Sequence, residues 1–64
     1  MNRKEKSANI VIRYALLKKR CVAENEFFDP ESKGRFQKRI DEIVKHFVRG
    51  LLTLDETMKM IAEV

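Results

Sequence analysis

The sequence predicts an all-α protein in which three helices form one domain and the last two helices form a C-terminal αα-hairpin. Two signals for helix N-termini, at Asp29-Pro30 and at Thr53, are each followed by apolar residues at helical spacing. The chain has 64 residues, which is enough for one domain at most. We therefore expect a single helical domain over residues 1–64, with helices at about 7–25, 30–49 and 54–63 and a flexible basic arm over residues 1–6.

The segment from about 7 to 25 carries apolar side chains in most helical directions. One stripe contains Ile10, Tyr14 and Leu17, and another contains Ile12 and Leu16. A helix that is apolar nearly all round is typical of a buried position. The β-branched and aromatic run over residues 9–14 also suits a short strand. We favour a helix, because residues 15–20 continue with good helix formers and no turn signal intervenes.

The segment from 30 to 49 has the clearest helical pattern. Asp29 is a suitable N-cap, Pro30 suits the first helical position, and Glu31 places a negative charge in the first turn. Gly50 stands where a left-handed residue ends many helices, and we expect Leu51 to pack back on the last turn. The apolar residues between them recur at intervals of four, three and four, at Phe36, Ile40, Ile43 and Phe47.

The third helix, over residues 54–63, begins with a capping box. Thr53 is the N-cap and Glu56 stands three residues later. The linker over residues 50–52 is very short, so the second and third helices should form a tight hairpin. The apolar stripe of the third helix consists of Leu54, Met58 and Ile61.

The composition argues against an enzyme, a metalloprotein and a membrane protein. Cys21 is the only cysteine and His46 the only histidine, so the chain has neither an internal disulfide nor a Cys/His metal cluster. We expect His46 to be a boundary residue and Cys21 to be packed as a small hydrophobe. No segment has the pattern of a signal peptide or the length of a membrane span. We expect a cytoplasmic protein with no cofactor and no small-molecule substrate.

The first helix has more apolar surface than one neighbouring hairpin can cover. We therefore expect the chain to associate through this helix, either with its own copy or with another protein, and to act as a small non-enzymatic regulatory or adaptor protein. Phe27 and Phe28 should anchor the connector to the core. Aromatic residues and arginine are enriched in interfaces. The expected contact residues are Ile10, Tyr14, Leu17, Phe27 and Phe28, with Arg13 and Arg20 at the rim.

An alternative function is DNA or RNA binding by a small basic regulator. The net charge is +4, and residues 1–20 hold seven basic and one acidic side chain, whereas residues 24–31 hold four acidic ones. If residues 9–14 formed a strand, the chain would resemble a ribbon–helix–helix dimer, which reads DNA with paired strands. The long acidic connector and the third helix do not fit that architecture. The candidate phosphate contacts are Arg3, Lys4, Lys6, Arg13, Lys18, Lys19 and Arg20.

Overall fold

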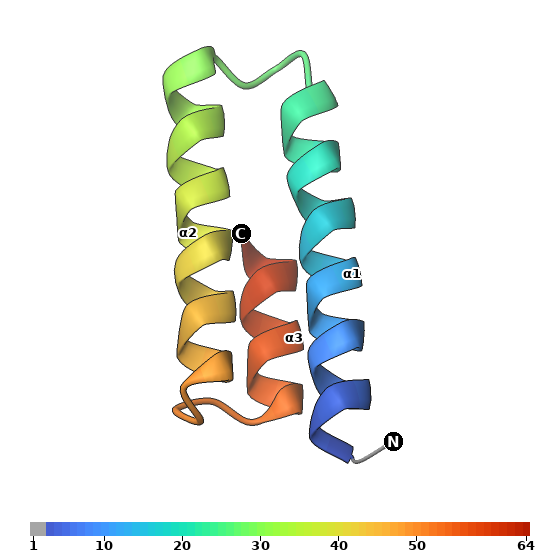
Figure 1. Cartoon of the computed structure of the whole chain (residues 1–64). Coiled ribbons are helices and arrows are strands. Elements are labelled where there is room, and N and C mark those ends of the chain that lie inside the picture. The colour runs from blue at the N-terminus through green and yellow to red at the C-terminus, as the bar shows by residue number, and fades with distance from the viewer. Residues whose placement is uncertain (1–2) are drawn as a thin grey trace.

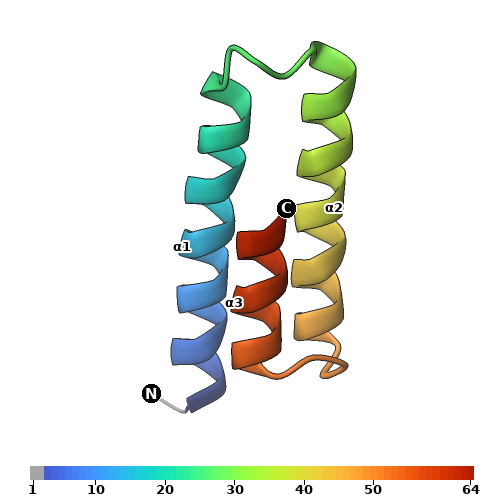
Figure 2. The same ribbon diagram turned by 180° about the vertical axis from the view of Figure 1, so that it is seen from behind.

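The chain folds into three helices that pack side by side in an up-down-up arrangement. The computed structural model describes the backbone of residues 3–64 and the side chains of residues 6–64. It contains α1 (Arg3–Glu24), α2 (Pro30–Val48) and α3 (Leu54–Glu63), and the described residues form no strand. Figures 1 and 2 show α1 and α2 as a long antiparallel pair, with the shorter α3 lying against both. The predicted all-α fold with a C-terminal hairpin is confirmed.

The first helix begins earlier in the structure than the sequence predicts, and residues 9–14 belong to this helix and do not form a strand. Residues 3–6, expected in a flexible arm, form about the first turn of α1. Arginine, lysine and glutamate are good helix formers, and no proline or glycine separates them from the helix that follows. Residues 9–14 are helical as well. The β-branched run there is overridden because both of its neighbours are helical and its Val11 is buried in the core.

The ends of α2 follow the local signals closely. The Asp29 carboxylate accepts a hydrogen bond of 2.7 Å from the backbone N–H of Ser32. At the other end Gly50 has a φ of 81°, which glycine adopts without strain. There the N–H of Gly50 donates to the carbonyl of Phe47 and the N–H of Leu51 donates to the carbonyl of His46, which is a Schellman motif.

One expectation about this motif is wrong. Leu51 does not pack back on α2 but is 65% exposed. Leu52, the next residue, packs against the core instead. The chain has to cross directly from α2 to α3, and the residue that points inward on this crossing is Leu52. The capping box of α3 is confirmed, because Thr53 and Glu56 exchange hydrogen bonds of 3.1 and 3.2 Å.

The core lies along the line where the three helices meet. The α3 helix runs parallel to α1 and, at ten residues, is much shorter than α1 with 22 or α2 with 19. Its first residue, Leu54, lines a cavity together with Ala8, and the carbonyl of Ala62 near its end accepts a hydrogen bond from Lys18. The last turn of α1 therefore has no neighbour on the α3 side. The fully buried apolar side chains are Val11, Ile40 and Ile61.

Candidate interaction surface

The outer side of α1 presents two leucines between two arginines. Leu16 and Leu17 are each 60% exposed, and together with Arg13 and Arg20 they line a shallow hollow. The spacing of these four residues, i, i+3, i+4 and i+7, places them on one side of the helix. We call these four residues the outer hollow. Ile10, also expected at the interface, is 48% exposed on the same helix.

The other expected contact residues lie elsewhere. Tyr14 and Phe28 are half-buried and pack against the core. The Phe28 ring lies 4.9 Å from the Phe36 ring, centroid to centroid, so this residue anchors the connector as expected. Phe27 does not, because its side chain is 96% exposed at the tip of the connector. The structure thus leaves Ile10, Leu17 and Phe27 as apolar residues free to meet a partner.

A second exposed apolar surface, which the sequence reasoning missed, follows the junction of α1 and α2. Lys19 and Asp41 form an ion pair of 2.9 Å across this junction. In two antiparallel helices with equal rise, this contact places Leu16 level with Val44 and Ile12 level with Val48. The spacings of four and three residues also put these side chains on the same sides of their helices as the ion pair. Ile12 and Val48 are 45% and 69% exposed.

We define the α1–α2 seam as Ala8, Ile12, Val44 and Val48. The seam lies on the side away from α3, because the opposite flank of α2, with Ile43 and His46, borders Leu52 and Met60 from the α3 side. The sequence contained a signal for it. Ile12 and Leu16 form a separate apolar stripe on the first helix, but only the position of α2 shows which stripe stays exposed.

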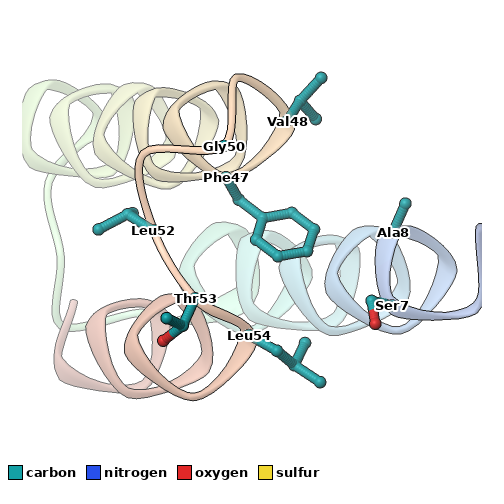
Figure 3. Close-up of a pocket in the computed structure, with 8 residues that line it drawn as sticks. All are labelled: Ser7, Ala8, Phe47, Val48, Gly50, Leu52, Thr53 and Leu54. Carbon is teal, nitrogen blue, oxygen red and sulfur yellow. The ribbon is translucent and has the colours of Figure 1, made fainter. Parts of the chain in front are cut away.

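The seam ends at an apolar cavity of about 400 Å³ near the α2–α3 turn. Figure 3 shows the Phe47 ring in the middle, with Val48 and Ala8 on one side and Leu54 on the other. A cavity of this size is within the range of small-ligand sites. Its lining is mostly apolar and consists of Ser7, Ala8, Phe47, Val48, Gly50, Leu52, Thr53 and Leu54.

Some of the candidate phosphate contacts are bound within the chain in the structure, and others are exposed. Lys18 and Lys19 bind within the chain, because the Lys18 ammonium donates to the Ala62 carbonyl at 3.2 Å and Lys19 pairs with Asp41. Lys6, Arg13 and Arg20 are exposed, and their spacing of seven places them in one line along α1. Arg3 and Lys4 belong to α1, but their side chains lie outside the described residues.

Among the described residues, the single cysteine and the single histidine are both exposed and show no catalytic arrangement with other side chains. Cys21 is exposed, which corrects the expectation of a packed hydrophobe. The reason is that α3 ends near Lys18 and does not reach the level of Cys21. His46 is exposed and its Nδ1 lies 2.6 Å from the Glu42 carbonyl oxygen of its own helix. Among the described residues, no three His, Cys, Asp or Glu side chains come together as metal ligands do.

None of the described helices combines the length and the hydropathy needed to cross a membrane. No protein-family model, no curated protein and no solved structure matches the chain.

Proposed function

We propose that this chain is a small non-enzymatic adaptor or regulatory protein that binds another protein through α1. The observation that carries the proposal is that α1 packs against both other helices and yet keeps four large apolar side chains 45–60% exposed. Exposed apolar patches that gather several large side chains mark interaction sites on soluble proteins, whereas single scattered apolar residues do not. The four side chains are Ile10, Ile12, Leu16 and Leu17.

The charges of the outer hollow indicate what kind of partner fits it. If two copies met through this face in an antiparallel way about Leu16 and Leu17, Arg13 of one copy would face Arg20 of the other. Like charges placed opposite each other disfavour such a contact. An amphipathic helix with an apolar stripe and flanking acidic residues would instead bury the leucines and pair with both arginines. We therefore assign the outer hollow to an acidic amphipathic helix of a different protein.

This proposal is testable with a synthetic peptide. The probe is a fluorescent helical peptide with a leucine stripe flanked by glutamates, and its twin carries lysines in place of the glutamates. We expect the glutamate peptide to bind, the lysine peptide not to bind, and Leu17→Gln to weaken binding by at least about tenfold, since anchors in an interface contribute ~1.4 kcal/mol or more. Lys59→Gln, an exposed change on α3, is the matched control. Equal binding by the wild type and Leu17→Gln would refute the assignment.

Nucleic-acid binding is the second candidate, supported by the line of Lys6, Arg13 and Arg20 on α1. Lys18 and Lys19 no longer contribute to it, because both bind within the chain. Fluorescence anisotropy of a mixed duplex DNA distinguishes the two functions. Three phosphate contacts give a log–log salt slope of about −3. Binding that stays micromolar or tighter at physiological salt would favour nucleic acid, and binding confined to low salt would favour the protein partner.

A further inference from the structure

The pair of α1 and α2 has a groove on each of its two sides. The α3 helix lies in the first groove, where its stripe of Leu54, Met58 and Ile61 packs into the core. The second groove is the α1–α2 seam, on the side away from α3. Its Ile12 and Val48 are 45% and 69% exposed. In the part of the chain that the structure describes, one groove thus holds a helix and the other is an open apolar surface.

The two grooves lie at the same level along the helix pair. The Lys18 ammonium donates to the Ala62 carbonyl near the end of α3. At the other end Leu54 lines the cavity together with Ala8, so α3 lies beside the stretch of α1 between Ala8 and Lys18. The seam reaches from Ala8 to Val44, which is level with residue 16 of α1, and so extends over about 12 Å of helix. Apolar side chains at i, i+4 and i+7, the spacing found in α3, extend over about 10.5 Å and therefore fit the seam.

Basic side chains border the seam on both helices. On α1 they are the two arginines of the outer hollow, since the hollow and the seam meet at Leu16. On α2 they are Lys45 and Arg49, both of which are exposed. Lys45 stands four residues after Asp41, whose ion pair with Lys19 marks the seam side of α2, so it lies on that side itself. Arg49 follows Lys45 one turn later. The apolar floor of the seam therefore has a basic rim along both edges.

The acidic side chains that the structure describes do not cancel this basic rim. Asp41 is already paired with Lys19 at 2.9 Å. Glu42 lies on the other flank of α2, where it borders Met60 of α3. The acidic residues of the connector lie at the far end of the bundle, and those of α3 lie on the opposite side of the helix pair. A helix with an apolar stripe and acidic flanks is complementary to such a surface.

The cavity at the end of the seam has room for one larger side chain of such a helix. Its volume is about 400 Å³, and Ala8 and Val48 belong both to its lining and to the seam. Figure 3 shows the Phe47 ring between these two residues and Leu54. An aromatic side chain placed there would lie against the Phe47 ring, and aromatic anchors in pockets dominate the energy of many interfaces.

We propose that the α1–α2 seam is a second docking groove, which takes a short acidic amphipathic helix of a partner protein with an aromatic residue at the cavity end. The bound helix lies opposite α3 and completes a four-helix bundle. The α3 helix is the precedent for this occupant, because it has ten residues and carries three acidic side chains and one basic side chain. A second copy of the chain fits less well, because two basic rims would face each other. The site goes beyond the outer hollow, since Val44 and Val48 of α2 form half of its floor.

Tryptophan fluorescence tests the floor of the seam. The probe is a lactam-bridged helical peptide with leucines at i+4 and i+7, a tryptophan at i and glutamates on both flanks. The chain has no tryptophan, so the emission reports on the peptide alone, and we expect it to move to shorter wavelength on binding. Val48→Gln should weaken binding by at least about tenfold. Phe27→Gln, an exposed apolar position at the opposite end of the bundle, is the matched control and should change binding by less than about twofold. Both side chains are exposed, so both variants keep the core intact.

The basic rim is tested through its α2 edge, which the outer hollow does not share. We expect Lys45→Gln combined with Arg49→Gln to weaken binding of the glutamate peptide by about threefold or more, since two exposed ion pairs are lost. A twin peptide with lysines in place of the glutamates should not bind. Unchanged binding by the double variant, or equal binding of the two peptides, would overturn the assignment of an acidic helix to the seam.

The seam and the outer hollow fail separately. Equal binding by the wild type and Val48→Gln overturns the seam proposal, and a loss with Leu17→Gln alone then retains the outer hollow. A loss with Val48→Gln alone supports the seam and rejects the outer hollow. Two further measurements test other occupants of the seam. A wild-type dimer in sedimentation equilibrium that Val48→Gln dissociates, or binding to phosphatidylglycerol vesicles that Val48→Gln abolishes, would show that a second copy or a lipid surface covers the seam and would overturn the proposal.

Discussion

Replacing Leu17 by glutamine tests whether the apolar surface of α1 is free in the single chain. Leucine and glutamine have similar helix propensities, so the helix itself should be little affected. Full burial of a leucine contributes ~1.5–3 kcal/mol. Because Leu17 is 60% exposed, the folded monomer gains less than half of this amount from it. We expect Leu17→Gln to lower the free energy of unfolding by about 1 kcal/mol at most.

Ile40→Ala provides the comparison. Ile40 is fully buried on α2 at the centre of the core, and truncation of such a side chain costs ~2–5 kcal/mol because a cavity remains. A chain of 64 residues has a total stability of roughly 3–10 kcal/mol. The core variant should therefore lose at least about a fifth of its stability and up to all of it, whereas the surface variant should stay well folded.

Urea unfolding, followed by circular dichroism at a protein concentration where the chain is monomeric, measures both variants. If Leu17→Gln loses as much stability as Ile40→Ala under these conditions, Leu17 is buried within the single chain. The single chain would then leave Leu17 no exposed surface for a partner, and the function proposed for α1 would be refuted. If the loss appears only at high concentration, a second chain covers Leu17, and the outer hollow is itself a self-association surface.

Three further substitutions test the conformations of two glycines and the N-cap of α2. Gly34→Ala should raise the free energy of unfolding by about 0.5–1 kcal/mol, since a Cβ there meets nothing within 4 Å and alanine is the better helix former. Gly50→Ala should lower it by about 1–2 kcal/mol, since φ is 81° there. If urea unfolding shows a rise in the free energy of unfolding for Gly34→Ala and a fall for Gly50→Ala, both predictions are confirmed, and changes of the same sign refute them. The hydrogen bond from the Ser32 N–H holds the pKa of Asp29 below its usual 3.8. A lowered pKa contributes stability above the unfolded-state pKa, and this contribution is lost as the pH falls below about 4. Asp29→Asn keeps the cap without the titration, so its unfolding midpoint should fall less between pH 5 and pH 3, about one unit on either side of that value, than the midpoint of the wild type.

The helix ends could be predicted from the sequence because their causes are local. The caps at Asp29 and Thr53 and the left-handed Gly50 depend on hydrogen bonds between residues at most five positions apart. The positions of Leu51 and Phe27 depend on contacts with other elements. Each stands next to another large apolar residue in a short connection, and sequence alone does not show which of the two turns inward.

The exposed surface of α1 was harder to predict for the same reason. The sequence shows that apolar residues surround this helix, but the side that stays open depends on where α2 and α3 lie. Because α3 is short, Cys21 remains uncovered. Because α2 carries Asp41 at the right level, Lys19 is held in an ion pair and is not free to bind phosphate. The Lys18 ammonium is similarly held by the Ala62 carbonyl, 44 positions further along the chain.

The arrangement of α1 gives a reason why a chain this small carries so many apolar residues on one helix. Its inner side, at Val11 and Val22, forms the core. Its flank at Ile12 borders α2 in the α1–α2 seam, and its outer side at Leu17 is proposed for a partner protein. A chain of 64 residues buries only about 60% of the surface exposed on unfolding, so its own core contributes little stability in reserve. A partner helix docked in the outer hollow would bury Leu16 and Leu17 and so add to the apolar burial of the core, whereas Arg13 and Arg20 oppose pairing of this face with its own copy.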